Sequence, residues 1–335
     1  MGRKYGRWEV IGSVGEGGQA HLFRVLDSTK AVSGERVLKR LKNVERKDLF
    51  DREIRAITGL QHPNILRIDD YELVGDSPYY VAEHCERGSL AKVGADRFRG
   101  DVRASLEALL PIVDALNAAH RTGVIHRDVK PPNILFRADG TPVLADFGIC
   151  HVDGDRLVTL TDEAMGSVNY IAPEMESGRR LGPPTDVTDV YSLGKVLFWM
   201  ISGGHIFGRE DHRGRPLPEI LGGQQFEHIH LLLDEMVVED PRRRIPMRLL
   251  KTRLQEMEAL VMGDFAPLKP SIGLRCRFCG LGTYVKHIGP KEQRVSRIGL
   301  QNIAGTDVRA LVCTRCGHLE IFDFGATTDK TWWDQ

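Results

Sequence analysis

The stretch His126-Arg127-Asp128-Val129-Lys130-Pro131-Pro132-Asn133 decides the interpretation of this sequence, because Asp146-Phe147-Gly148 and then Ala172-Pro173-Glu174 follow it. Each motif alone is compatible with an ordinary turn. Their joint order and spacing match the needs of phosphoryl transfer: an acceptor for a hydroxyl proton, cations that face phosphates, and oxygen ligands for magnesium. We assign these tasks, in this order, to Asp128, to Lys39 with Lys130, and to Asp146 with Asn133.

Two charged residues upstream fit the same chemistry. The run Val37-Leu38-Lys39 is an apolar strand that ends in a lysine, which suits a point charge aimed at phosphates from a rigid element. Glu53 lies in an amphipathic helix predicted over residues 47–60 and is the expected partner of Lys39. Single charges of this kind are more often solvated surface groups, so both assignments depend on the downstream motifs.

A glycine-rich segment lies between two strand-like runs near the start of the chain. Glycines at this place would let backbone N–H groups approach a polyphosphate without interference from a Cβ atom. A plain glycine-rich hairpin is the alternative, since short glycine motifs often occur by chance. The segment consists of Gly15, Glu16, Gly17, Gly18 and Gln19.

The bulk properties of the chain set the frame for these motifs. Its 335 residues suit about two domains and an appendage, and 41% hydrophobic content is typical of a globular protein. Lys+Arg and Asp+Glu both number 46, so whole-chain charge gives no reason to expect nucleic acid or an anionic membrane as partner. No signal peptide and no membrane span is expected, and we predict a cytoplasmic location.

The pattern along the chain predicts an α+β architecture with two lobes. Short β-rich runs and one helix fill the first part, and long helical periodicities dominate from about Ser105 to Leu260. We expect a β-rich lobe over residues 5–83 and a mainly helical lobe over residues 86–262. The predicted remainder is a linker at 263–274, a small metal-bound β ribbon at 275–326 and a tail at 327–335.

On these motifs the chain resembles the eukaryotic-like (Hanks-type) Ser/Thr protein kinase family, from about Tyr5 to Glu258. The resemblance implies a two-lobed fold with ATP and Mg²⁺ (or Mn²⁺) in the cleft and protein hydroxyls as substrates. Against the glycine-loop pattern, Ala20 replaces the third glycine and Leu22 the valine. Lys130 is typical of the Ser/Thr branch, and Ser167 stands where that branch usually has Thr.

The resemblance also assigns site residues. It implies that Asp128 is the catalytic base, that Asn133 and Asp146 hold magnesium, and that Glu53 holds Lys39 on the phosphates. Ala82 would stand at the gate of an inner pocket, with adenine at the backbone near Glu83 and Cys85. The cofactor-binding set implied in full is Gly15, Glu16, Gly17, Gly18, Gln19, Leu22, Val37, Lys39, Glu83, Cys85, Asn133, Leu135 and Asp146.

Three structural and regulatory expectations follow from the same family. Glu174 should pair with Arg244, and Asp189 should brace the catalytic loop, residues 126–133. Arg127 beside Asp128 implies a cationic pocket that a phosphorylated activation segment could neutralise. The phosphosite candidates are Thr159 and Thr161, with an unmodified polar loop as the alternative.

Four of the six cysteines form two C-x-x-C pairs near the end of the chain. Four thiolates at this spacing predict a closed tetrahedral Zn²⁺ site of the zinc-ribbon type, with a structural metal. A redox dithiol is the alternative. Basic residues (8) exceed acidic ones (2) between Arg275 and His318, so nucleic acid binding stays open, although we favour a protein or intramolecular contact. The predicted ligands are Cys276, Cys279, Cys313 and Cys316.

Two other classes of function compete with an active protein kinase. A pseudokinase scaffold would keep the fold and lose the chemistry, but Lys39, Asp128, Asn133 and Asp146 are all present. A small-molecule phosphotransferase would share the fold and a loop aspartate but typically lacks the Ala-Pro-Glu segment. The sequence therefore favours transfer to protein Ser or Thr.

Overall fold

The computed structural model describes residues 3–16, 20–43, 45, 47–75, 77–147, 169–176, 181–212, 224–261, 284–286, 308–313 and 319–323. Two compact units emerge. The first comprises Met1–Leu221 and Leu233–Leu254, and the second comprises Gly222–Leu232 and Gln255–Gln335. None of the helices in the described ranges is long and apolar enough to cross a membrane.

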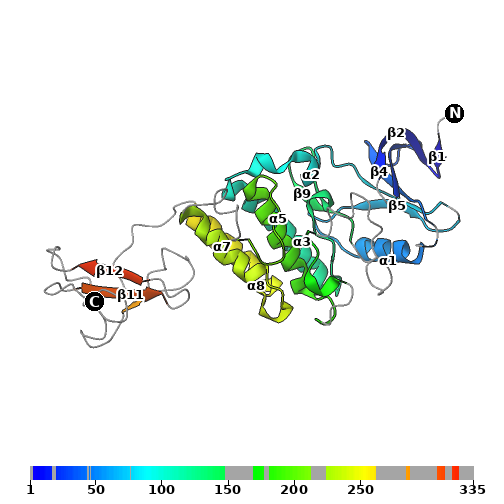
Figure 1. Ribbon diagram of the computed structural model, residues 1–335. Helices are drawn as coiled ribbons and strands as arrows, with labels where there is room; N and C mark the ends of the chain where they lie inside the picture. Colours follow the sequence, from blue (N-terminus) through cyan, green and yellow to red (C-terminus); the bar gives the residue numbers. More distant parts are fainter. Residues whose placement is uncertain are drawn as a thin grey trace. The chain divides into compact units, whose positions relative to one another are not determined.

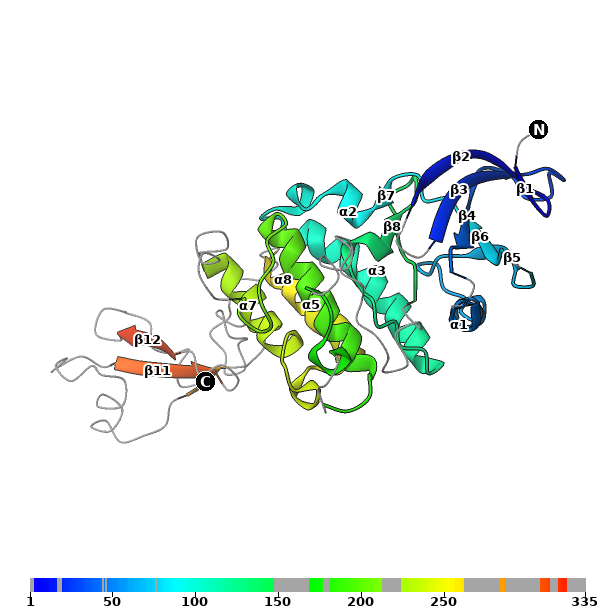
Figure 2. The same cartoon turned by 45° about the vertical axis from the view of Figure 1, so that its right-hand side comes forward.

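The first unit begins with a six-stranded antiparallel sheet in the order β1-β2-β3-β4-β6-β5 (Figures 1 and 2). The chain alternates short turns and paired strands, as its β-rich runs predict. Register shifts interrupt the β2–β3 pairing at two places and the β5–β6 pairing between Ile68 and Asp70. The strands are β1 Lys4–Tyr5, β2 Trp8–Glu16, β3 Ala20–Asp27, β4 Arg36–Leu41, β5 Ile68–Glu72 and β6 Tyr79–Glu83.

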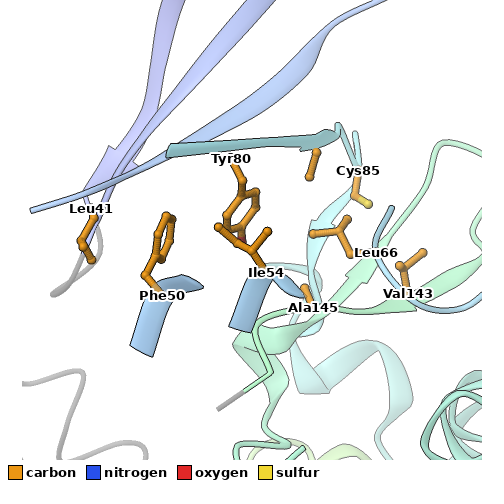
Figure 3. Packing of buried hydrophobic residues seen from close by; sticks show 9 residues of the cluster. Leu41, Phe50, Ile54, Leu66, Tyr80, Cys85, Val143 and Ala145 are labelled. Atoms are coloured by element: carbon orange, nitrogen blue, oxygen red, sulfur yellow. The ribbon is translucent and has the colours of Figure 1, made fainter. Parts of the chain in front are cut away.

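This sheet buries side chains on both of its faces. Successive side chains of a strand point to opposite faces. In β6, accordingly, Tyr79 and Val81 join a cluster that contains the buried Trp8. Tyr80 and Ala82 join a second cluster on the face that meets helix α1, Lys47–Thr58. Figure 3 shows this second cluster, to which α1 contributes Phe50 and Ile54, one helical turn apart.

A helical body and a second small sheet follow. Helix α3, Val102–Arg121, begins at Asp101, whose side chain accepts the backbone N–H of Ala104. The antiparallel sheet β7-β8-β9 consists of Gly88–Ser89, Ile134–Phe136 and Pro142–Leu144. Short helical turns lie at α2 Leu90–Val93, η2 Ala95–Phe98, η3 Pro131–Asn133, η5 Pro173–Met175 and η6 Pro241–Arg243.

Helix α5, Asp186–Ser202, is buried along almost its whole length and packs beside α3 (Figure 1). It starts with a capping box between Thr185 and Thr188 and ends at Gly203, whose φ of 74° suits a residue without a Cβ atom. A helix that is apolar on all sides is expected in a domain centre. Helices α7 Gln224–Met236 and α8 Met247–Val261 complete the helical part of the described chain.

The described part of the second unit contains a three-stranded antiparallel sheet in the order β10-β11-β12. Its strands are Tyr284–Lys286, Val308–Cys313 and Leu319–Asp323. In the register Tyr284 pairs with Cys313, and Val312 pairs with Leu319. The first residue of β10 therefore lies at the end of the sheet where β11 ends and β12 begins.

Buried Lys195 of α5 makes the stability of the first unit depend on pH. Its Nζ donates to the carbonyl oxygen of Phe207 at 2.7 Å, and burial, with a smaller effect of Arg209, lowers the pKa of Lys195 to about 7. Between pH 7 and 9 the unfolded chain therefore binds more protons than the folded one. Over this range wild type should gain about 2 kcal/mol of unfolding free energy relative to Lys195→Met.

Denaturant unfolding of both proteins at several pH values measures this difference. If the unfolding free energies of wild type and Lys195→Met change by the same amount from pH 7 to 9, Lys195 keeps its proton in the folded state. Arg103→Met, on an exposed ion pair of α3, is the control that removes a cation without a buried titration.

Candidate active site

The buried carboxylate of Asp189 binds the backbone of the catalytic loop. Asp189 of α5 accepts the backbone N–H groups of His126 and Arg127 at 2.9 and 2.8 Å. Its Oδ2 also lies 2.7 Å from Nε2 of His120 at the end of α3. The expected bracing of the catalytic loop by Asp189 is confirmed. Arg127 has a φ of 69°, a conformation costly for a side-chain-bearing residue, and these bonds hold it.

His126 connects the catalytic loop to the segment that carries Asp146. Its Nδ1 accepts the backbone N–H of Asp128, so the ring proton belongs on Nε2, which lies 3.0 Å from the carbonyl oxygen of Ala145. Burial lowers the pKa of His126 and keeps this neutral tautomer. The ring also packs against Phe147, with 4.5 Å between centroids. The catalytic loop and the Asp146 loop thus share one rigid contact.

Asp128, Lys130 and Asn133 form a compact group on the catalytic loop. Oδ2 of Asp128 lies 2.9 Å from Nζ of Lys130 and accepts the Asn133 amide at 2.9 Å. The same amide donates to the backbone carbonyl of Asp128 at 2.8 Å. Both amide hydrogens of Asn133 are therefore directed at Asp128, and its amide oxygen receives no hydrogen bond from the residues that the structure describes.

Lys39 extends from β4 to two carboxylates. Its Nζ lies 2.6 Å from Oδ1 of Asp146 and 3.8 Å from Oε1 of Glu53 on α1. Burial opposes the positive charge, but Asp146 and Glu53 keep the pKa of Lys39 well above its ordinary value. Partial burial likewise opposes the charge of Asp146, and Lys39 and the hydrogen bonds to it hold the pKa of Asp146 below its ordinary value. Lys39 and Asp146 are therefore both charged at neutral pH.

The residues expected around the nucleotide lie on the strands that flank these charges. Gly15 and Glu16 end β2, and Gly15 pairs with Leu22 in β3. Leu22 pairs in turn with Lys39, and Val37 pairs with Ala82. Leu135 is half-buried on β8 and packs against the cluster of Figure 3. Gly17, Gly18 and Gln19 lie outside the described residues.

The segment after β6 is fixed by a charged pair. Arg137 donates Nε and Nη2 to the two carboxylate oxygens of Glu83 at 2.7 and 2.8 Å. Glu83 also accepts the backbone N–H of Arg67 at 3.0 Å, and its own backbone N–H donates to the Arg67 carbonyl. The side chain of Glu83 therefore has a structural role, because it joins Arg137 to the backbone of Arg67. Cys85 is buried, and burial raises the pKa of its thiol to about 12, so the thiol stays protonated.

The expected pair of Glu174 and Arg244 is confirmed. Nη1 and Nη2 of Arg244 donate to the two oxygens of Glu174 at 2.6 and 2.7 Å, in the bidentate geometry that a guanidinium favours. Thr188 also donates to Glu174, and Nε of Arg244 donates to the carbonyl of Val238. Both side chains are almost completely buried. The phosphosite candidates Thr159 and Thr161, with Ser167, lie outside the described residues.

Two residues of the site were not predicted from the sequence. His120 contacts the anchoring carboxylate of Asp189, and Tyr80 of β6 donates its hydroxyl to Oδ1 of Asp146 at 3.1 Å. The signal for Tyr80 was available only with the strand register, because Tyr80 is the residue directly opposite Lys39. His120 could be assigned only once the structure placed the end of α3 beside Asp189 of α5.

Comparison with known proteins agrees with this geometry. The profile of the protein kinase domain matches residues 8–252, and the chain therefore belongs to the protein kinase family. A probable serine/threonine-protein kinase of Clostridium perfringens is 34% identical over 204 residues, which is 59% of this chain and 29% of the relative.

Two further relatives extend the comparison. The serine/threonine-protein kinase PrkC of Bacillus subtilis is 32% identical over 203 residues, 59% of this chain and 31% of the relative. The serine/threonine protein kinase OSK3 of Oryza sativa is 31% identical over 218 residues, 63% of this chain and 42% of the relative. The chain thus spans about a third of the length of the bacterial relatives that it matches.

Removal of one partner from the buried pair should destabilise the fold strongly. Glu174→Gln leaves the buried guanidinium of Arg244 without its counter-charge, which costs about 3–5 kcal/mol. The control is Arg242→Ala, because Arg242 is exposed and its solvent-screened pair with Asp240 should contribute little to stability. Chemical denaturation of both variants measures the difference. Equal losses in the two variants would contradict a structural role of the buried pair.

Proposed function

We propose that this chain is an ATP-dependent protein kinase that transfers the γ-phosphoryl group to Ser or Thr hydroxyls of proteins. The observation that carries the proposal is the convergence of Lys39, Asp128, Lys130, Asn133 and Asp146. Lys130 and the Ala-Pro-Glu segment favour protein Ser/Thr over a small-molecule acceptor, as do the names of the relatives.

The proposed chemistry divides among the residues as follows. Asp128 accepts the proton of the substrate hydroxyl while the new oxygen–phosphorus bond forms and the bond from the γ-phosphorus to the bridging oxygen of ADP breaks. Lys130 lies 2.9 Å from the carboxylate of Asp128 and offers its cation to the transferred group. Lys39, held by Asp146 and Glu53, supplies a second cation for the phosphates. Asn133 keeps the Asp128 carboxylate oriented.

Two of these residues offer ligands that fit a magnesium or manganese ion. The carboxylate of Asp146 and the amide oxygen of Asn133 are the oxygen donors that Mg²⁺ prefers. Both amide hydrogens of Asn133 are engaged with Asp128, which turns the amide oxygen to other partners. When bound, the ion neutralises charge that develops on the phosphate oxygens. Asn133 and Asp146 are the proposed ligands.

We also propose that the kinase phosphorylates its own activation segment at Thr159 or Thr161. Arg127 supports this role, because its side-chain Nε is buried and finds no hydrogen-bond acceptor among the described residues. A buried unpaired donor on a cation is costly, and a phosphate group offers several strong acceptors. Arg127 follows His126 directly, so a group bound to Arg127 would act on the catalytic loop itself.

Transfer of labelled phosphate from ATP tests the kinase assignment. Wild type should label itself and Ser/Thr peptides. Asp128→Asn should lose roughly 10²–10⁴-fold in rate through loss of the base. Asp146→Asn should abolish the Mg²⁺ response. Asp114→Asn, on α3 in a half-exposed pair with Lys251, should keep wild-type activity. Mass spectrometry of the labelled chain identifies the modified residues.

The outcomes separate the candidate functions. Nucleotide binding without any transfer by wild type would favour the pseudokinase scaffold. Transfer to small alcohols but not to peptides would favour the small-molecule phosphotransferase. Phosphate found only outside residues 148–172 would overturn the role proposed for Thr159 and Thr161.

We further propose that Cys276, Cys279, Cys313 and Cys316 bind one structural Zn²⁺. Cys313 is the last residue of β11, and in the sequence the Cys313–Cys316 motif lies between β11 and β12. Tyr284, which pairs with Cys313, starts β10 a few residues after Cys279. The strand register therefore favours a common end of the sheet for both pairs. Cys276, Cys279 and Cys316 lie outside the described residues, and no group of potential ligands is found among the described ones.

Metal analysis of the purified chain tests the zinc site. Wild type should carry about one zinc ion per chain, and a strong chelator should remove it. Cys279→Ser and Cys313→Ser should each lose the metal, while Cys85→Ala should retain it, since Cys85 is a separate buried thiol of the first unit. A metal-free chain with a reversible disulfide would instead support a redox dithiol.

The proposed partner of this ribbon is a protein, either a separate one or the kinase itself. Four thiolates around zinc carry a net negative charge, which offsets part of the local excess of basic residues. Nucleic acid is therefore the less favoured ligand. We place the protein in the cytoplasm, where the reducing conditions suit zinc thiolates better than disulfides.

A further inference from the structure

One buried polar group near the active site has no part in the chemistry described so far. Tyr80 lies in the middle of β6, directly opposite Lys39 of β4, and only 3% of its surface is exposed. Figure 3 shows its ring directed from β6 toward α1, beside Phe50 and Ile54. The rings of Tyr80 and Phe50 stack with 5.6 Å between centroids. Packing alone therefore fixes where the phenol hydroxyl points.

The hydroxyl of Tyr80 and the ammonium of Lys39 hold the same oxygen. Tyr80 donates to Oδ1 of Asp146 at 3.1 Å, and Lys39 donates to it at 2.6 Å. The ammonium also lies 5.6 Å from the centroid of the Tyr80 ring. Within the part of the chain that the structure describes, no group hydrogen-bonds to Oδ2 of Asp146. The side chain of Asp146 keeps 42% of its surface exposed, so the carboxylate is accessible to a ligand.

Two donors on one carboxylate oxygen constrain it more than one does. Lys39 is a flexible point charge and can follow the carboxylate through rotation. The phenol is rigid, since its ring is held between β6 and α1, and its hydroxyl adds a neutral donor without adding charge. Asp146 has a φ of 54°, which is unfavourable for aspartate and needs fixed surroundings. A phenylalanine would satisfy the apolar packing equally well, so packing does not explain the hydroxyl.

We propose that Tyr80 is a positioning residue that fixes Oδ1 of Asp146 and thereby presents Oδ2 to the divalent cation. This inference rests on the proposed role of Asp146 as a magnesium ligand. Tyr80 touches neither substrate nor nucleotide in the proposal. It acts through Asp146, and it links three elements at one point: β4 through Lys39, α1 through Phe50 and the Asp146 loop.

Tyr80→Phe removes the hydroxyl and keeps the ring. The test is the affinity for a non-hydrolysable fluorescent ATP analogue, measured by displacement in EDTA and over a Mg²⁺ series, so that no turnover is involved. The variant should bind the analogue in EDTA like wild type. Half-maximal tightening by Mg²⁺ should require roughly tenfold more Mg²⁺, which is the scale expected for loss of a hydrogen bond to a charged group.

Two control variants separate this effect from others. Tyr79→Phe removes a neighbouring hydroxyl on the opposite face of β6 and should leave the Mg²⁺ curve unchanged. Asp146→Asn should remove the Mg²⁺ response altogether. Tyr80→Met removes both the hydroxyl and the aromatic ring but keeps an apolar side chain. It therefore provides a second measurement if Tyr80→Phe is poorly folded.

Each of three results would overturn either the role of Tyr80 or the role of Asp146 as a metal ligand. A Tyr80→Phe curve that coincides with wild type, while Asp146→Asn loses its response, overturns the role of Tyr80 and leaves the proposed kinase intact. Weaker binding of Tyr80→Phe in EDTA, with an unchanged Mg²⁺ midpoint, shows a purely structural role and also overturns it. A normal Mg²⁺ response in Asp146→Asn shows that the proposed metal ligand itself is wrong.

Discussion

The buried carboxylate of Asp189 is the constraint on which the active site depends. It replaces water as the acceptor for two consecutive backbone N–H groups of the catalytic loop, and it carries its charge at the centre of the helical body. A buried charge is tolerated only when several donors surround it, and here His120, His126 and Arg127 provide them. The unfavourable φ of Arg127 is maintained by the same bonds. Catalytic geometry is thus derived from α5, a helix that is buried along almost its whole length.

The second requirement of the site is that groups from different elements meet. Lys39 comes from the sheet, Glu53 from α1 and Asp146 from the loop that follows β9. His126 contacts the Asp146 loop on one side through Ala145 and Phe147, and Tyr80 contacts it on the other. Asp146 is therefore constrained from both lobes, which is the arrangement that a precisely placed metal ligand needs.

Much of the fold and of the candidate site was predictable from the sequence, because the order of the motifs indicates the chemistry of phosphoryl transfer. The helix expected at residues 47–60 is α1, Lys47–Thr58, and the pairing of Glu174 with Arg244 and the bracing by Asp189 are as expected. Tyr80 could not be assigned, because an aromatic residue in an apolar strand indicates only burial until the register places it opposite Lys39. Similarly, Glu83 gave no sign that its carboxylate would bind Arg137, which is remote in sequence.

The irregular edge strand β5 has a consequence for how the sheet behaves beside other chains. An open strand edge is a template for pairing with further strands and hence for aggregation. β5 interrupts its ladder between Ile68 and Asp70, and it carries three carboxylates in five residues: Asp69, Asp70 and Glu72. Asp69 is bound by Arg36 and Arg67, and Asp70 by Arg7 and Trp8. The edge is therefore charged and uneven, which disfavours polymerisation by strand addition at the side of the sheet that no other described strand covers.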